Sequence, residues 1–136
     1  KIKVGSKTDH VSAFWDFLPT VCDLAGIEMP KGIDGVSFAP TLLRSGKQQE
    51  HSFLYWAFHE RGGRVAVRKG DWKLVKYNVD KDPQAKWELY DLSKDVGESK
   101  DVATRYPEIV RELSSLAVGA EVPSPIEKFQ FLRPLN

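Results

Sequence analysis

A histidine, a glutamate and an arginine stand together at the end of an aromatic segment. His59, Glu60 and Arg61 follow residues 53–58 and lead directly into a pair of glycines. The sequence predicts that a strand ends here in a turn, and binding groups often collect at loop ends on a rigid sheet. An imidazole beside a guanidinium can hold an anionic substrate group. We therefore nominate His59, Glu60 and Arg61 as candidate substrate-binding residues, with an ordinary polar turn as the competing interpretation.

The other residue types that perform chemistry are isolated along the chain. The single cysteine, Cys22, lies in an apolar segment, where burial keeps a thiol protonated and inert. His10, His51 and His59 lack the spacing and the neighbouring Cys, Asp or Glu of a metal site, and we interpret His10 and His51 as surface or loop histidines. Gly70 and the pair after Arg61 do not lie between a strand and a helix N-terminus, as a phosphate-binding loop does. We predict no catalytic and no metal-binding residue in this chain.

Basic and aromatic side chains form a second candidate surface. Basic residues cluster in one predicted hairpin, at Arg64, Arg68, Lys69, Lys73 and Lys76. They could bind a sulfated or phosphorylated sugar, but the solvated face of an antiparallel sheet is the simpler interpretation. Aromatic residues that could stack on sugar rings are Phe53, Tyr55, Trp56, Phe58, Trp72 and Trp87. Core packing explains most of these, although one face of the aromatic strand can remain exposed.

Composition narrows the class of protein. The chain has 136 residues, and its 20 Lys and Arg nearly balance its 19 Asp and Glu. A net charge of +1 gives no field that would attract nucleic acid. No apolar run approaches the length of a membrane span. A single cysteine forms no disulfide within the chain, so it does not identify a redox compartment.

The segments that position these residues predict an α+β fold. An apolar periodicity over 14–25 indicates a helix that Gly26 ends, and a short helix is expected over 37–43. Residues 106–116 read as a further helix with Pro107 at its first position. Between them lie expected strands at 53–58, 65–68, 72–77 and 87–92. Short turns between consecutive strands favour an antiparallel sheet of about four strands, packed by the last helix. The proline-containing residues 121–136 are expected to be an extended tail.

Several short motifs follow one another in a distinctive order. They are Asp9 with Val11-Ser12; Asp16-x-x-Pro19-Thr20-x-x-Asp23-Leu24-Ala25-Gly26; Asp34-Gly35-Val36-Ser37 with Pro40-x-Leu42-Leu43; Ala66-Val67-Arg68-x-Gly70-Asp71-Trp72-Lys73-Leu74; and Leu89-Tyr90-Asp91-Leu92-Ser93-x-Asp95-x-Gly97-Glu98. Together they resemble the C-terminal part of formylglycine-dependent sulfatases, the arylsulfatase and N-acetylgalactosamine-6-sulfatase-like group of the alkaline-phosphatase superfamily. The resemblance runs to about the helix at Tyr106. Val96 departs from it, since the family usually has proline there.

The resemblance implies a division of the chain. Residues 1–46 would be the C-terminal end of the α/β catalytic domain, a helical remnant of that larger domain. Residues 47–136 would be the sulfatase C-terminal subdomain, an antiparallel sheet with a helix and an extended tail. In the family this subdomain lies beside the active-site cleft. The upstream catalytic domain of the same polypeptide and a sulfated carbohydrate are therefore the expected partners.

The nucleophile motif of the family is missing from this chain. That motif is Cys or Ser, any residue, Pro or Ala, any residue, Arg, whereas Leu24 and Gly26 stand at the two diagnostic positions after Cys22. The resemblance implies that the calcium ligands and the formylglycine lie upstream. We expect no cofactor in this chain and no sulfatase activity from it alone.

Three hypotheses follow for the function. The first is a C-terminal segment of a sulfatase that completes the fold and walls the substrate cleft. The second is a stand-alone carbohydrate-binding or interaction module, and the third is the same region of a related phosphatase or phosphonate hydrolase. A severed segment should leave the apolar face of the helix at 14–25 uncovered, whereas a stand-alone module should bury it. Export to the periplasm, cell surface or lysosome is expected for the parent by analogy only.

Overall fold

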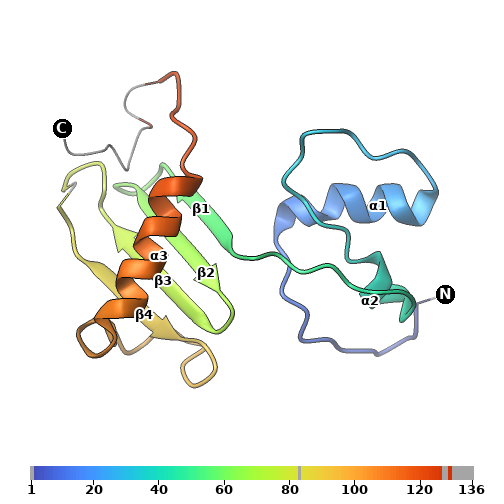
Figure 1. The fold of residues 1–136 in the computed structure, drawn as a ribbon, viewed down its shortest axis with the longest axis horizontal. Coiled ribbons are helices and arrows are strands. Elements are labelled where there is room, and N and C mark those ends of the chain that lie inside the picture. The colour runs from blue at the N-terminus through green and yellow to red at the C-terminus, as the bar shows by residue number, and fades with distance from the viewer. Residues whose placement is uncertain (1, 83, 127–128, 130–136) are drawn as a thin grey trace. The chain divides into compact units, whose positions relative to one another are not determined.

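The chain folds into two compact units in the computed structural model (Figure 1). Unit 1 is Lys1–Ser52 and unit 2 is Phe53–Asn136. The structure describes residues 2–82, 84–126 and 129. The regular elements of unit 1 are helical, and unit 2 combines a sheet with a helix. The α+β prediction is therefore confirmed.

Unit 1 contains one short 3₁₀ turn and two helices. The turn η1 is Phe14–Asp16, α1 is Phe17–Ala25 and α2 is Ala39–Leu43. Gly26 ends α1 with a left-handed φ of 67°, a conformation that suits glycine because it has no Cβ. The predicted stop at Gly26 is therefore confirmed, and Pro19 lies in the first turn of α1, where proline is tolerated.

The buried face of α1 is not its most apolar face. Pro19, Thr20 and Cys22 are the buried residues of this helix. The large apolar side chains in and around it are exposed instead, at Phe14, Phe17, Leu18, Val21, Leu24, Ile27 and Met29. Phe14 is 92% exposed and Phe17 is 61% exposed. The apolar periodicity found the helix correctly, but unit 1 uses the smaller, more polar side of it for packing.

Unit 2 is built on a four-stranded antiparallel sheet. The strands are β1 Leu54–Phe58, β2 Arg64–Lys69, β3 Trp72–Tyr77 and β4 Trp87–Asp91, in the order β1-β2-β3-β4. Each strand pairs with the next along the chain, as the short connections predict. Gly70 makes the tight turn between β2 and β3 with a φ of 57°.

One face of the sheet packs against the last helix, α3, Pro107–Ala120 (Figure 1). Pro107 takes the first helical position, as predicted. Alternate strand residues meet α3 in an apolar core formed by Val65, Val67, Leu74, Val79, Leu89, Leu113 and Ala117. A second 3₁₀ turn, η2 Ala103–Arg105, precedes α3.

Two further predictions concern the C-terminal tail and membrane-spanning segments. The predicted tail 121–136 falls mostly outside the described residues, so its conformation stays a prediction. Within the described part of the chain, no helix combines the length and the apolar character needed to cross a membrane.

Candidate functional site

The three nominated residues lie in the turn that joins β1 to β2. His59 follows the last residue of β1, and its ring lies 4.5 Å from that of Phe129, centroid to centroid. The next two, Glu60 and Arg61, are exposed. The backbone closes the turn through a hydrogen bond from Gly63 N to Glu60 O at 3.2 Å. The predicted strand-to-turn position is therefore correct, and the three residues stay together at one end of the sheet.

The glycine pair fixes this turn against the next loop. Gly62 has a φ of 88° and Gly63 a φ of 74°. A Cβ on Gly63 would lie 2.7 Å from Asp80 Oδ1, and one on Gly62 would lie 2.9 Å from Asn78 Oδ1. Backbone hydrogen bonds from Val79 and Asp80 to these glycines join the two loops. Only glycine satisfies both the conformation and the space, so the turn has a defined position on the sheet.

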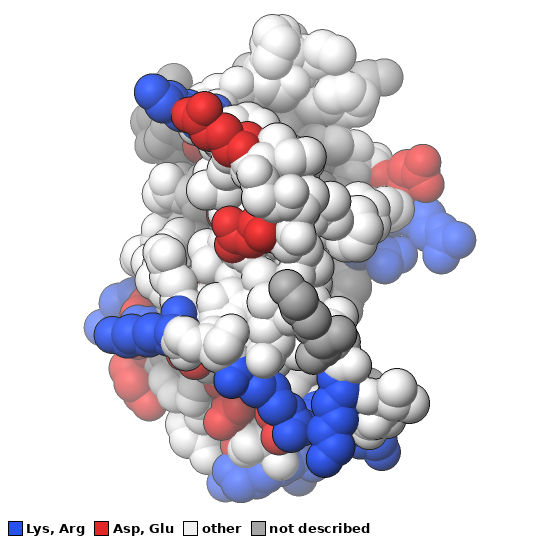
Figure 2. Space-filling model, turned by 90° about the vertical axis from the view of Figure 1, so that its right-hand side faces the viewer, with Lys and Arg blue, Asp and Glu red and all other residues white. Residues whose placement is uncertain are grey.

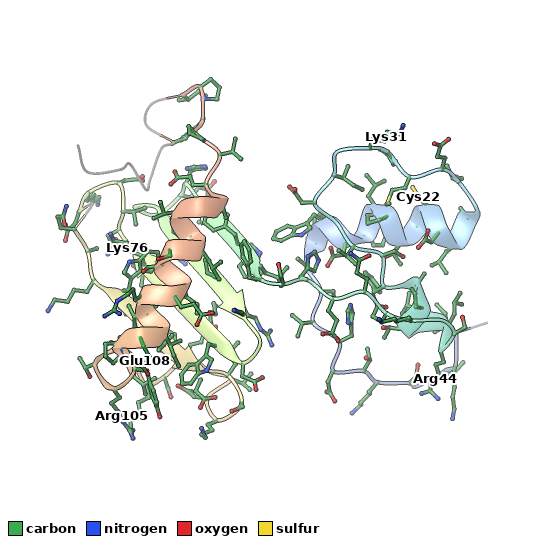
Figure 3. All side chains as sticks on the ribbon, viewed as in Figure 1. Cys22, Lys31, Arg44, Lys76, Arg105 and Glu108 are labelled. Carbon is green, nitrogen blue, oxygen red and sulfur yellow. The ribbon has the colours of Figure 1, made fainter. Side chains whose placement is uncertain are left out.

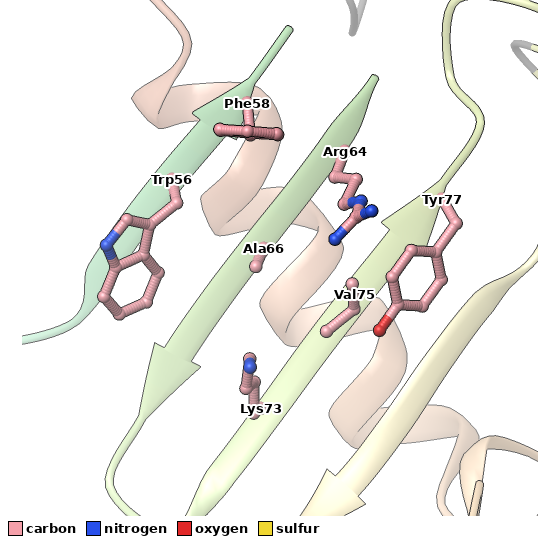
Figure 4. Close-up of a pocket in the computed structure, with 7 residues that line it drawn as sticks. All are labelled: Trp56, Phe58, Arg64, Ala66, Lys73, Val75 and Tyr77. Carbon is pink, nitrogen blue, oxygen red and sulfur yellow. The ribbon is translucent and has the colours of Figure 1, made fainter. Parts of the chain in front are cut away.

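A hollow of about 390 Å³ lies on the sheet next to this turn. Its walls come from three strands, at Trp56, Phe58, Arg64, Ala66, Lys73, Val75 and Tyr77. These side chains stand on the face of the sheet that faces away from α3 (Figure 4). Ala66, in the middle strand, pairs in register with Trp56 on one side and Val75 on the other. The small side chain of Ala66 between larger neighbours creates the hollow.

Arg64 is the central cation of the hollow. In register, Phe58 pairs with Arg64 and Arg64 pairs with Tyr77, so the three form one row across the sheet. The guanidinium carbon lies 5.9 Å from the centre of the Phe58 ring and 5.7 Å from that of Tyr77. Both distances fall within the range of cation–π attraction. The two rings therefore hold the guanidinium in place (Figure 4).

The remaining polar groups of this face are mostly paired. Lys73 Nζ lies 2.5 Å from Glu98 Oε1, and Tyr90 donates a hydrogen bond to Glu88. Burial, and then the charges of Glu88 and Glu98, raise the pKa of Tyr77, while Arg64 acts in the opposite direction. Tyr77 is thus a neutral hydrogen-bonding group. Arg64 forms no ion pair among residues 2–82, 84–126 and 129.

Unit 1 contains a separate, buried polar network around Asp16. The Asp16 carboxylate is 1% exposed and accepts hydrogen bonds from Ala13 N at 2.7 Å, Val36 N at 2.8 Å and His51 Nε2 at 2.8 Å. Thr20 donates its hydroxyl to Asp16 O at 2.6 Å and accepts from the backbone N–H of residue 38. The network ties together segments that lie far apart in the sequence.

The network keeps Asp16 ionised. Burial disfavours the charged form, but the hydrogen bonds from Ala13, Val36 and His51 outweigh it and hold the pKa of Asp16 below its usual range. Gly35 completes the arrangement, because a Cβ there would lie 2.3 Å from the carbonyl oxygen of Trp15. The motifs around Asp16 and Gly35 are thus explained by the packing of unit 1. No group of three metal-binding side chains occurs in the part of the chain that the structure describes.

Cys22 is a packing residue of unit 1, and the surface carries charges of both signs. Cys22 projects from α1 and is buried, as predicted for a packing residue (Figure 3). On the face drawn in Figure 2, basic and acidic side chains both occur among uncharged ones. This distribution agrees with the balanced charge of the chain.

Sequence analysis did not predict the surroundings of Arg64 in unit 2 or those of His51 in unit 1. The basic hairpin was expected to be a solvated sheet face, and the position of Arg64 between two aromatic rings of that face was not predicted. The spacing of Trp56 and Phe58, two residues apart on one strand, was the available signal, because it places both on the same face. His51 was expected to be a surface or loop histidine; it lies outside the helices and strands, but it is half-buried and bonded to Asp16.

Comparison with known proteins shows that the chain is similar to sulfatases. Residues 1–118 match the family model described as N-sulphoglucosamine sulphohydrolase, C-terminal. An N-acetylglucosamine-6-O-sulfatase of Bacteroides thetaiotaomicron is 33% identical over 125 residues, which cover 85% of this chain and 22% of that protein. Arylsulfatase K of Danio rerio is 30% identical over 123 residues, 85% of this chain and 23% of that protein.

A solved structure shares the fold as well as the sequence. The structure of BT4656 in complex with its substrate D-glucosamine-2-N,6-O-disulfate superposes with a TM-score of 0.69 at 30% identity. The match covers 85% of this chain and 25% of that one. The chain spans about a fifth of the length of the curated relatives it matches. Its sequence and its fold together place it in the sulfatases, in the family of N-sulphoglucosamine sulphohydrolase C-terminal domains.

Proposed function

We propose that this chain is the C-terminal part of a sulfatase that hydrolyses sulfate esters on a sulfated carbohydrate, and that it completes the fold of the catalytic domain and walls the substrate cleft. The observation that carries the proposal is the family match over residues 1–118, combined with the small share of each relative that it covers. Sulfated glucosamine is the substrate class that we favour, because it is named for two of the relatives that cover 85% of the chain.

The surface of unit 1 supports the fragment role. Large apolar side chains along α1 are exposed, including Phe14, Phe17 and Leu24. Several large apolar side chains exposed on one short segment commonly mark an interaction site. A domain that folded alone would be expected to bury such a face, so this observation favours the first hypothesis over a stand-alone module.

The turn at the end of β1 supports the second part of the proposal. His59, Glu60 and Arg61 lie in a turn whose position is fixed by Gly62 and Gly63. A rigidly placed, exposed loop with an imidazole and a guanidinium is suited to contact an anionic substrate. In the proposed enzyme these residues orient the sugar, whereas the bond to sulfur is broken elsewhere.

Calcium and formylglycine belong to the proposal only as components of the upstream region. The described residues bring no set of metal ligands together, so we assign no ligand and no catalytic step to this chain. Its own contribution is to bind and orient the substrate and to cover apolar surface.

The decisive experiment measures sulfate release by the longest natural polypeptide that contains the chain. We expect it to hydrolyse an aryl sulfate and a 6-O-sulfated glucosamine, and we expect the isolated chain to be inactive. Alanine at His59, Glu60 or Arg61 should raise KM for the sulfated sugar, with little effect on the aryl sulfate. The matched control is Lys94→Ala, an exposed residue beyond the opposite end of the sheet.

Other results would favour the alternatives. Faster hydrolysis of a phosphonate or phosphate monoester than of any sulfate ester would indicate the related hydrolase. A natural polypeptide that begins just before Lys1, binds sugar and releases no sulfate would indicate the stand-alone module. Unchanged KM in all three alanine variants would remove the turn from the substrate site.

A further inference from the structure

We propose that the hollow around Arg64 is a subsite for a second, non-reacting sulfated sugar unit of the substrate. This inference rests on the proposed function, but it concerns a surface distinct from the turn that carries His59, Glu60 and Arg61. The hollow lies on the sheet face opposite α3, and none of those three residues lines it (Figure 4). It would extend recognition from one sugar residue to an oligosaccharide.

The first argument is the state of Arg64. Phe58 and Tyr77 hold the two sides of its guanidinium at 5.9 and 5.7 Å from their ring centres. No acidic side chain pairs with it among the described residues. A guanidinium presents its N–H donors at its edge, in a geometry that matches two oxygens of a sulfate group. Holding the side chain between two rings reduces the entropy that it would lose on binding such a group.

The second argument is the shape and chemistry of the hollow. Its volume of about 390 Å³ lies within the range of small-ligand pockets. Trp56, Ala66 and Val75 provide apolar surface for the C–H groups of a sugar ring, and the Tyr77 hydroxyl stays neutral and can hydrogen-bond. Anion, apolar ring face and hydroxyl groups are the three features of a sulfated sugar, and each meets a matching group here.

The third argument is the charge of this face. Lys73 is already paired with Glu98 at 2.5 Å, and Glu88 accepts a hydrogen bond from Tyr90. Of the two cations that line the hollow, Lys73 and Arg64, Arg64 is the one without an ion-pair partner among residues 2–82, 84–126 and 129, and Glu88 on the same face keeps its negative charge. A single fixed cation suits one sulfate group on an otherwise neutral sugar, and it does not suit a polyanion such as nucleic acid, which needs an array of cations.

Binding measurements on the longest natural polypeptide that contains the chain test this subsite. The probe is a defined sulfated glucosamine oligosaccharide, titrated calorimetrically beside the same oligosaccharide without sulfate. We expect Arg64→Gln to raise Kd for the sulfated probe at least about tenfold and to leave Kd for the desulfated probe unchanged. Ala66→Leu, which fills the hollow and keeps the charge, should weaken both probes.

The matched control is Arg68→Gln. Arg68 lies on the same strand and the same face as Arg64, but it bonds to Gly70 O at 3.0 Å and does not line the hollow. Its variant should change Kd by less than about twofold. Equal binding by both Arg variants would overturn the subsite, and so would a lowered melting temperature of Arg64→Gln with unchanged binding, which would mean that polypeptide fills the hollow.

The outcome is separable from that of the proposed function. An active sulfatase whose Arg64 and Arg68 variants bind the probe equally would reject the subsite alone. A polypeptide that releases no sulfate but binds the sulfated probe through Arg64 would reject the proposed activity and retain the subsite.

Discussion

Unit 1 places a carboxylate at its centre and its largest apolar side chains at its surface, whereas unit 2 buries its large aliphatic side chains between a sheet and a helix. Asp16 is 1% exposed in the first, and Leu113 is 1% exposed in the second. Hydrogen bonds are directional and require every partner, while apolar packing depends mainly on the area removed from water. Unit 1 is therefore sensitive to the loss of a single polar atom, and unit 2 to the loss of volume.

The difference also concerns whether each unit has an apolar core of its own. Unit 2 satisfies its apolar face internally through α3. Unit 1 leaves Phe14 and Phe17 exposed and relies on a polar network to fix its loops. This contrast is what we expect if unit 1 is the edge of a larger domain and unit 2 is a subdomain with its own core.

The largest expected effect is on the core of unit 2. Leu113→Ala should lower the free energy of unfolding of this unit by about 3 kcal/mol, because it removes a buried side chain and leaves a cavity. Val118→Ala on the same helix is the control, since Val118 is 54% exposed, and it should cost less than about 0.5 kcal/mol. Denaturant titration measures both. Equal losses in the two variants would contradict the assignment of the core.

A somewhat smaller effect is expected in unit 1. Asp16→Asn should destabilise it by about 2 kcal/mol, because the amide nitrogen cannot accept one of the N–H groups that the carboxylate satisfies. Asp23→Asn, an exposed position on α1, is the control. Amide hydrogen exchange at residues 13 and 36 would report the loss locally. Unchanged protection there would show that the network does not stabilise unit 1.

Asp16 should make unit 1 sensitive to acid, and Tyr55 should make unit 2 sensitive to alkali. The folded pKa of Asp16 is lowered, so its stabilisation of unit 1 is present above about pH 4 and is lost as the pH falls through the folded value. Burial, and next the charge of Glu121, raise the pKa of Tyr55 to about 12. Its stabilisation of unit 2 is full below about pH 10 and is lost as the pH rises toward that value.

Amide NMR signals followed across pH would separate the two responses. Asp16→Asn should remove the acid response of unit 1. Tyr55→Phe should reduce the alkaline response of unit 2 without abolishing it, because burial also raises the pKa values of Tyr77 and Tyr90. An acid response of unit 1 that persists in Asp16→Asn would contradict the assignment to Asp16.

The smallest effect is expected at the surface of unit 2. Lys69 and Glu112 form an ion pair at 2.5 Å, but both side chains are about half exposed. Glu112→Gln should therefore change the free energy of unfolding by less than about 0.5 kcal/mol, and salt should reduce the difference further. A change above about 1 kcal/mol would show that this pair is part of the core rather than of its rim.

The local structure of this chain was predictable from local sequence. The alternation in 64–77 identified β2 and β3, and the apolar stripe after Pro107 identified α3, which runs four residues beyond the expected end at Leu116. Glycine at 26 and 70 marked a helix end and a turn, because those positions need a left-handed backbone. The position of His59, Glu60 and Arg61 in a turn followed from the same reasoning, whereas their contact with substrate stays a prediction.

Partners from distant segments were not predictable in this way. His51 reaches Asp16 across 35 residues, and two lysines of the basic hairpin pair with acids far along the chain, Lys69 with Glu112 and Lys73 with Glu98. Periodicity gives the face of an element on which a residue lies, but not which loop returns to it.

The sequence by itself determined the strands, the main helices, the turns and the family of this protein, since backbone conformation and motif order depend on neighbouring residues. Tertiary structure alone decided that Arg64 lies between Phe58 and Tyr77, because that placement requires the register of three strands. It also decided that α1 buries Thr20 and exposes Phe17. An amphipathic pattern states that an apolar face exists, and only the packing of the whole polypeptide determines what covers it.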